Sequence, residues 1–135
     1  MTTIALVDDE NSIRTSVSLA LESEGFKVDV FQNGIEALEA LESKTYDLGL
    51  FDIKMPKMDG NELLAKVRSS KKDDLKEMPI IFLTSKDQEQ DEIIGLRMGA
   101  ADYITKPFSQ KLLSERIRTD LRIYQNRKAP TTQEN

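Results

Sequence analysis

Residues 48–52 are Leu-Gly-Leu-Phe-Asp, a short and continuously apolar run that ends in an acid. A strand in the middle of a parallel sheet has this composition, because helices cover both of its faces. Residues 80–83 and Thr3–Val7 have the same apolar character. These three runs therefore predict the central strands of a parallel sheet.

Two further strands are predicted at residues 28–31 and 103–104, where Asp29 and Asp102 interrupt or flank the apolar side chains. Charged side chains of this kind indicate the edges of a parallel sheet. A segment of helical period follows each predicted strand. Alternating strands and helices form parallel βαβ units with right-handed crossovers. We therefore predict an α/β, flavodoxin-like, doubly wound fold, with a five-stranded parallel sheet in the order 2-1-3-4-5 and five helices.

One domain is predicted for residues 1–125, which is an ordinary size for a single core. Residues 69–77 are strongly charged and are predicted to form a loop after the third helix. Residues 126–135 contain Pro130 and few apolar side chains, so they cannot bury enough surface to offset the entropy of ordering them. We expect a flexible tail there, or a truncated linker to a missing effector domain.

The composition excludes several kinds of chemistry and partner. The chain has no Cys and no His, so it offers no thiol nucleophile, no disulfide and no imidazole base. Its 24 acidic side chains outnumber 19 basic ones and give a net charge of -5, which disfavours direct contact with DNA or anionic lipid. No apolar run is long enough to cross a bilayer, and no basic leader is present. We expect a cytoplasmic protein that makes no membrane contact.

Polar side chains follow four of the predicted strands. Asp8 and Asp9 follow the first strand, Asp52 the third, Thr84 the fourth and Lys106 the fifth. Ligands of doubly wound sheets bind at the carboxyl ends of the strands, so these side chains should converge there. Three neighbouring carboxylates repel one another unless a cation lies among them, and Mg²⁺ prefers such oxygen ligands. We predict a Mg²⁺ site in which Asp9 and Asp52 bind directly and Asp8 binds mainly through water.

Asp52 is the candidate nucleophile of this site. A carboxylate is already ionised at neutral pH and needs no general base. Lys106 would neutralise a phosphoryl oxygen, and the Thr84 hydroxyl could move to bond another. Taken one at a time, such residues are more often turn residues, helix caps or solvated charges, so the prediction depends on their joint placement.

Four motifs resemble those of two-component receiver domains over nearly the whole chain, from residue 3 to about residue 124. The motifs, in chain order, are Val7-Asp8-Asp9-Glu10, Phe51-Asp52-Ile53-Lys54-Met55-Pro56-Lys57-Met58-Asp59-Gly60, Leu83-Thr84-Ser85 and Asp102-Tyr103-Ile104-Thr105-Lys106-Pro107-Phe108. The resemblance implies the CheY-like form of the predicted fold. It also implies a signalling module that receives a phosphoryl group from a sensor histidine kinase, and not a multiple-turnover enzyme.

The resemblance assigns roles to particular residues. It makes Asp52 the phosphoacceptor and the backbone carbonyl of Lys54 a further Mg²⁺ ligand. Thr84 becomes the switch hydroxyl, and Tyr103 an aromatic switch that swings inward when Thr84 moves. Core packing is the alternative interpretation of Tyr103. The peptide bond before Pro107 is expected to be cis, which is accessible at low energy only before proline.

The stretch Tyr103-Ile104-Thr105-Lys106-Pro107-Phe108 resembles the OmpR/PhoB subfamily. The sequences of residues 51–56, 82–87 and 106–110 are similar to those of ChvI-type regulators in particular. The resemblance implies a C-terminal DNA-binding domain, absent from this chain, and a homodimer through the fourth helix, fifth strand and last helix of the phosphorylated protein. Ile94 and Leu112 depart from the pattern, because they stand where the subfamily places charged residues of this interface. Asp102, Arg116 and Arg122 remain as charged candidates for the pairing.

Alternative functions predict different observations. A freestanding interaction protein would have a reading frame that ends near Asn135, with no DNA output. A phosphohydrolase would use the same nucleophile, but Lys54 stands two residues after Asp52 where a second acid would be needed for rapid turnover. In receivers, positions two after the phosphoacceptor and the switch hydroxyl set the lifetime of the phosphoryl group, and here they are Lys54 and Lys86. Flavin binding is disfavoured, because three clustered acids would repel the flavin phosphate in the absence of a metal. Nucleotide binding is disfavoured, since no Gly-rich phosphate loop follows the first strand.

Overall fold

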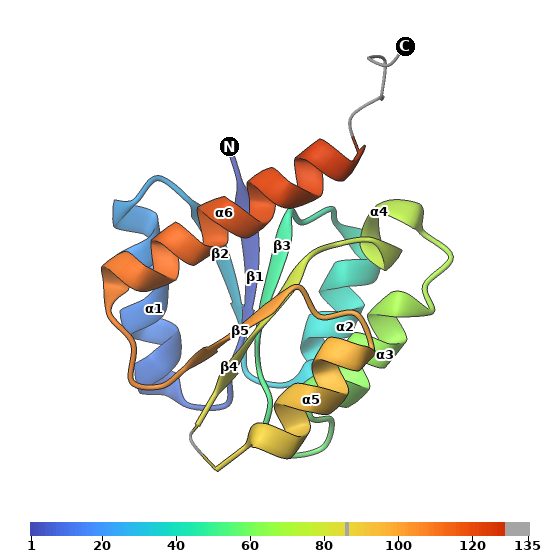
Figure 1. Ribbon diagram of the computed structural model, residues 1–135, viewed down its shortest axis with the longest axis horizontal. Helices are drawn as coiled ribbons and strands as arrows, with labels where there is room; N and C mark the ends of the chain where they lie inside the picture. Colours follow the sequence, from blue (N-terminus) through green and yellow to red (C-terminus); the bar gives the residue numbers. More distant parts are fainter. Residues whose placement is uncertain (86, 129–135) are drawn as a thin grey trace.

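A computed structural model describes residues 1–85 and 87–128 as a central parallel sheet with helices on both faces (Figure 1). The sheet order β2-β1-β3-β4-β5 confirms the predicted topology. The strands are β1 (Thr3–Val7), β2 (Lys27–Phe31), β3 (Leu48–Asp52), β4 (Ile80–Thr84) and β5 (Asp102–Thr105). The helices are α1 (Asn11–Ser23), α2 (Gly34–Ser43), α3 (Gly60–Arg68), α4 (Asp73–Lys76), α5 (Glu89–Arg97) and α6 (Gln110–Lys128).

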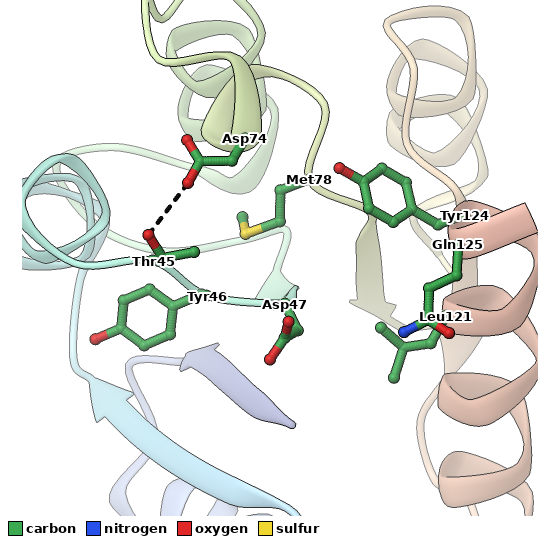
Figure 2. Close-up of a pocket in the computed structure, with 8 residues that line it drawn as sticks. All are labelled: Thr45, Tyr46, Asp47, Asp74, Met78, Leu121, Tyr124 and Gln125. Atoms are coloured by element: carbon green, nitrogen blue, oxygen red, sulfur yellow. Dashed lines mark hydrogen bonds between the residues drawn. The ribbon is translucent and has the colours of Figure 1, made fainter. Parts of the chain in front are cut away.

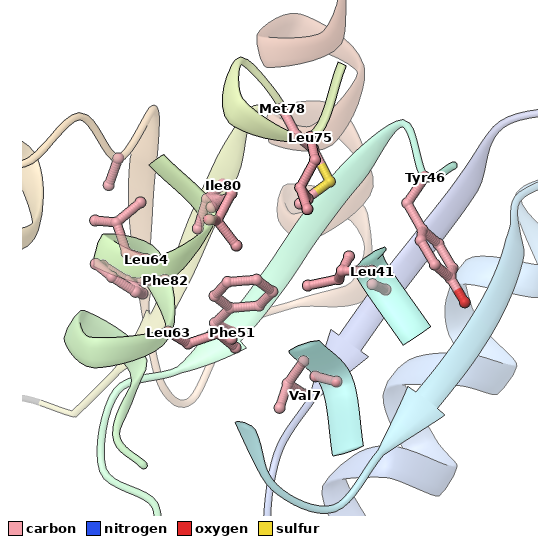
Figure 3. Close-up of a cluster of buried hydrophobic side chains, with 14 of the residues drawn as sticks. Val7, Leu41, Tyr46, Phe51, Leu63, Leu64, Leu75, Met78, Ile80 and Phe82 are labelled. Atoms are coloured by element: carbon pink, nitrogen blue, oxygen red, sulfur yellow. The ribbon is translucent and has the colours of Figure 1, made fainter. Parts of the chain in front are cut away.

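Each face of the sheet has its own apolar cluster, because side chains of a strand alternate between the faces. On one face, Leu6 and Leu50 pack with Leu21 of α1 and Ile117 of α6. On the other face, the cluster lies between the sheet and α2, α3 and α4, and the rings of Phe51 and Phe82 are its largest fully buried side chains (Figure 3). Every residue of β3 and of β4 is buried, which explains their continuous apolar character.

Two features of the fold differ from the prediction. The charged stretch 69–77 is not entirely a loop, because α4 forms within it and buries Leu75. The described residues therefore contain six helices where five were predicted. Four residues are too few to show a helical period in the sequence. Helix α6 continues to Lys128 and so includes the first three residues of the predicted tail. The rest of the predicted tail lies outside the described residues.

The strand register aligns the carboxyl ends of the four strands that carry the predicted site. Val7 of β1 is opposite Phe51 of β3, so the next residues, Asp8 and Asp52, leave the sheet side by side. Asp52 is opposite Leu83, and Thr84 is opposite Thr105. Asp8, Asp52 and Thr84 therefore lie at the same edge of the sheet, and Lys106, the residue after β5, lies beside them.

Gly60 brings the start of α3 against the end of β3. A Cβ atom at this position would lie 2.6 Å from the backbone oxygen of Asp52 and 2.9 Å from the Cα atom of Ile53. The Gly60 N–H donates to the Ile53 carbonyl at 2.8 Å. Asp59 completes a capping box with Glu62, which fixes where α3 begins. The loop that follows Asp52 is thereby held close beneath the candidate site.

Candidate functional site

The three predicted carboxylates lie together at the carboxyl edge of the sheet. Asp8, Asp9 and Asp52 each offer an oxygen atom, and these atoms all lie within 4.8 Å of one another. Asp8 and Asp52 are buried, whereas Asp9 is exposed. The cluster is therefore exposed to solvent at Asp9, while its other two carboxylates are buried.

Lys106 places its ammonium group between the two buried acids. Its Nζ atom is 3.3 Å from Asp8 Oδ2 and 3.3 Å from Asp52 Oδ1, and Glu10 Oε1 lies 3.9 Å away. The Lys106–Pro107 peptide bond is cis, as the resemblance implied. The Lys106 N–H donates to the Thr84 carbonyl at 2.6 Å, so β4 positions the start of this loop.

Burial and mutual repulsion change the protonation of the cluster. Burial, and then the negative charge of Asp8, raise the pKa of Asp52 to about 7, against the opposing effect of Lys106. Burial also raises the pKa of Asp8, although the Glu10 N–H and Lys106 oppose this. Burial would lower the pKa of Lys106, but Asp52 and Asp8 raise it above its ordinary value. Lys106 therefore stays positively charged. Its single positive charge does not offset the negative charges of both buried carboxylates, so the pKa values of Asp8 and Asp52 stay raised.

The donor set fits a hard divalent cation. Three carboxylates converge with one ammonium group, so the cluster retains excess negative charge when all are ionised. Mg²⁺ is bound in proteins by one or two carboxylates, and several waters complete its shell. Asp9 is exposed and can orient toward such an ion, whereas Asp8 is held by the Glu10 N–H at 2.9 Å. Binding through the Lys54 carbonyl stays a prediction.

Thr84 lies at the end of β4, fully buried, and its hydroxyl donates to Glu92 Oε2 of α5 at 2.8 Å. Tyr103 is half-buried and packs against the apolar cluster that contains Phe51. This packing agrees with the alternative interpretation of Tyr103, and its role as a switch stays a prediction. Lys86 lies outside the described residues.

Two acidic residues near the site were not anticipated from the sequence. Glu92 accepts from Thr84, and Asp91 Oδ2 lies 3.2 Å from the Nζ atom of Lys54. Both belong to the first turns of α5. No motif marks them, because the contacts depend on how α5 packs on β4 and not on local spacing. The sequence signal that could have suggested these contacts is the position of Asp91 and Glu92 one helical turn before Gly95, where a helix can approach the sheet closely.

Hollows in the surface separate into those near this site and those remote from it. A hollow of about 360 Å³ lies at the opposite edge of the sheet, where Thr45, Tyr46 and Asp47 precede β3 (Figure 2). The Thr45 hydroxyl there donates to Asp74 of α4 at 3.1 Å. None of the predicted site residues lines it. A hollow of about 410 Å³ between α1 and the loop at Lys106–Phe108 adjoins the site, and its lining is mainly apolar.

Comparison with known proteins agrees with the geometry of this site. Residues 4–118 match the response regulator receiver domain family, and the chain belongs to that family. Its members are signalling proteins and not multiple-turnover enzymes. The alkaline phosphatase synthesis transcriptional regulatory protein PhoP of Bacillus subtilis is 41% identical over 119 residues, which cover 88% of this chain and 48% of PhoP.

The regulatory protein VanRc of Enterococcus gallinarum is 38% identical over 122 residues, covering 90% of this chain and 51% of VanRc. These two curated relatives are OmpR/PhoB-family regulators, which confirms the subfamily resemblance; the similarity to ChvI-type regulators stays a prediction. The chain spans about half the length of both relatives. A CheY-like receiver domain protein of Methanospirillum hungatei has a TM-score of 0.86 at 32% identity, covering 94% of this chain and 98% of that chain. Across the part of the chain that the structure describes, no helix is both long and apolar enough to cross a membrane.

Proposed function

We propose that the chain is a phosphoacceptor domain in which Asp52 receives a phosphoryl group from a phosphohistidine of a sensor kinase. The observation that carries this proposal is the position of Asp52. Its carboxylate is buried, lies within 4.8 Å of two further carboxylates, and has the Lys106 ammonium 3.3 Å away. This arrangement pairs a nucleophile with a cation for the incoming phosphoryl oxygens.

In the transfer, an Asp52 carboxylate oxygen attacks phosphorus. The new P–O bond forms as the P–N bond breaks, and the electron pair of the broken bond stays on the leaving nitrogen. The histidine leaves as neutral imidazole if its other ring nitrogen already carries a proton. Mg²⁺ bound by Asp9, Asp52 and the Lys54 carbonyl, with Asp8 through water, would offset the charge of the phosphoryl oxygens.

The residues of the chain have distinct tasks in this step. Asp52 must be ionised to act as a nucleophile, although its surroundings raise its pKa to about 7. Asp8 and Asp9 attract the cation that favours the ionised form. Lys106 is already 3.3 Å from Asp52 and can bond a phosphoryl oxygen with little movement. Thr84 can donate to another oxygen once its hydroxyl leaves Glu92.

The output of the phosphorylated domain would be a changed surface at α5, β5 and α6. Ile94 and Leu112 are exposed on α5 and α6 and add apolar area to this surface. Arg116 pairs with Asp102 of the same chain at 2.8 Å, and a second copy would have to compete for that pairing. We propose homodimerisation through this surface, control of a C-terminal DNA-binding domain in the full-length protein, and a cytoplasmic location. The length of the curated relatives and their names as transcriptional or regulatory proteins support this output.

The test is intact-protein mass spectrometry after incubation with acetyl phosphate and Mg²⁺. We expect one phosphoryl adduct on the native chain, and none on Asp52→Asn or when the metal is chelated. Asp47→Asn is the matched control, because Asp47 is an exposed acid at the other end of the same strand and should leave the adduct unchanged. A native chain that gains no adduct from acetyl phosphate or from a phosphohistidine donor would refute the proposal.

A further inference from the structure

The Thr84 hydroxyl already has a partner in this structure. Thr84 is fully buried at the end of β4, and its Oγ1 atom donates to Glu92 Oε2 of α5 at 2.8 Å. Glu92 is half-buried and lies in the first turn of that helix. A hydrogen bond to a carboxylate is about twice as strong as a bond between neutral groups, and burial strengthens it further. The contact is therefore a specific link between the edge of the sheet and α5.

Other contacts hold the first turns of α5 against the site. Gly95 lies directly on the ring of Phe82, where a Cβ atom would overlap the ring, so α5 packs close to β4. The Asn61 amide donates to the Asp91 carbonyl at 3.4 Å. The Nζ atom of Lys54 lies 3.2 Å from Asp91 Oδ2. The close approach at Gly95 allows Glu92, three residues earlier, to reach the end of β4.

We propose that Glu92 is a positioning residue that holds the Thr84 hydroxyl on the α5 side and so opposes the phosphorylated state of Asp52. The inference depends on the function proposed above, since it concerns the same site. A hydroxyl has one hydrogen to donate. Thr84 therefore donates either to Glu92 or to a phosphoryl oxygen, and each bond excludes the other.

Competition of this kind couples phosphorylation to the attachment of α5. When Thr84 bonds the phosphoryl group, Glu92 loses the hydroxyl and α5 loses one link to β4. The reverse must hold with equal size, because coupling between two sites is reciprocal. Removing the Glu92 carboxylate should therefore favour the state in which Thr84 bonds a phosphoryl oxygen. A change of about tenfold is expected, as for one net hydrogen bond to a charged group.

The first experiment measures the affinity of the protein for beryllofluoride in saturating Mg²⁺, by titration of backbone amide NMR signals. Beryllofluoride is the probe because it resembles a phosphoryl group on a carboxylate. We expect Glu92→Ala to bind it about tenfold more tightly than the native chain. Glu92→Gln keeps a neutral acceptor for Thr84 and should show a smaller gain. Glu89→Ala removes an exposed acid of the same helix and should show almost none.

The gain in beryllofluoride affinity caused by Glu92→Ala must also depend on the Thr84 hydroxyl. In a Thr84→Val background, Glu92→Ala should leave beryllofluoride affinity unchanged, because there is no hydroxyl left to release. An equal gain in both backgrounds, or an equal gain in Glu89→Ala, would overturn the inference and indicate a general charge effect. Affinity for Mg²⁺ alone should stay the same in all Glu92 variants.

A second measurement separates this inference from the proposed function. Urea unfolding is measured for the unphosphorylated native chain, for Glu92→Gln, for Thr84→Val and for the variant that carries both changes. These free energies of unfolding give the coupling between the Glu92 and Thr84 side chains. A measurable coupling supports the link, and its absence overturns the inference even if Asp52 is phosphorylated normally. A native chain that accepts no phosphoryl group and binds no beryllofluoride would refute the proposed function, and with it the role of Glu92, whatever the coupling.

Discussion

Replacing Asp52 with Asn should stabilise the metal-free protein at neutral pH. The residue Asp52 is 5% exposed, and burial together with the adjacent Asp8 raises the pKa of its carboxyl from 3.8 to about 7. In the unfolded chain the group ionises freely above pH 4, but in the folded chain it resists ionisation up to pH 7. The folded state therefore loses stability as pH rises from about 4 to about 7, and loses no more above that.

The size of the effect follows from the shift. A change of about three pKa units corresponds to about 4 kcal/mol at pH 7.5. Asn has nearly the same size as Asp and removes this destabilisation, which already includes the opposing effect of Lys106. Because Asn places a buried amide where the carboxyl was, we expect a smaller net gain of about 2 kcal/mol in the free energy of unfolding.

The assay is urea unfolding followed by far-ultraviolet circular dichroism, because the chain has no Trp for fluorescence. It should be run from pH 4.5 to pH 8 with a chelator, and again with Mg²⁺. Mg²⁺ should stabilise the native chain at pH 7.5 much more than Asp52→Asn. Asp47→Asn is the control and should be stabilised by Mg²⁺ as much as the native chain. The electrostatic reasoning is refuted if Asp52→Asn is less stable than the native chain at pH 7.5 without metal. It is also refuted if the free energy of unfolding of Asp52→Asn falls between pH 4 and 7 as steeply as that of the native chain.

Three further changes test other parts of the structure by the same unfolding assay. Gly95→Ala should lose about 1–3 kcal/mol, because the added methyl overlaps the Phe82 ring; an unchanged stability would show that α5 packs less closely on β4. Asp59→Ala should lower the free energy of unfolding by about 1 kcal/mol, because it removes the side-chain cap of α3. Asp59→Asn keeps a capping oxygen and should retain most of the native stability. Asp120→Asn should gain about 1 kcal/mol at pH 8 and none at pH 4, since burial and then the neighbouring Asp102 raise the pKa of Asp120 to about 7. A gain at pH 4 equal to that at pH 8 would contradict this cause.

The sheet was predictable because its pattern is local to each strand. The bounds of β1 were predicted without error, and those of the other four strands within one residue at either end. Asp29 and Asp102 placed β2 and β5 at the edges, where the structure has them. The convergence of Asp8, Asp9 and Asp52 followed from the topology, since parallel strands bring their carboxyl ends to one edge.

Features that depend on packing between elements were not predictable in this way. Helix α4 is too short for a period, and its stability comes from Leu75 in the apolar cluster. The partner of Thr84 is eight residues away on a helix whose position depends on Gly95 and Phe82. The pairing of Arg116 with Asp102 crosses from α6 to β5 and leaves no trace in the spacing of either segment.

The aligned strand ends have a consequence for how the protein matures. Asp8, Asp52, Thr84 and Lys106 are separated in sequence by dozens of residues, and they meet only when β1, β3, β4 and β5 are paired in register. A partly folded chain, or one still emerging from the ribosome before residue 106, lacks the assembled carboxylate and ammonium cluster. On the function proposed above, competence to receive a phosphoryl group would therefore arise only after most of the sheet has formed, and an incomplete molecule would not draw phosphoryl groups away from finished ones.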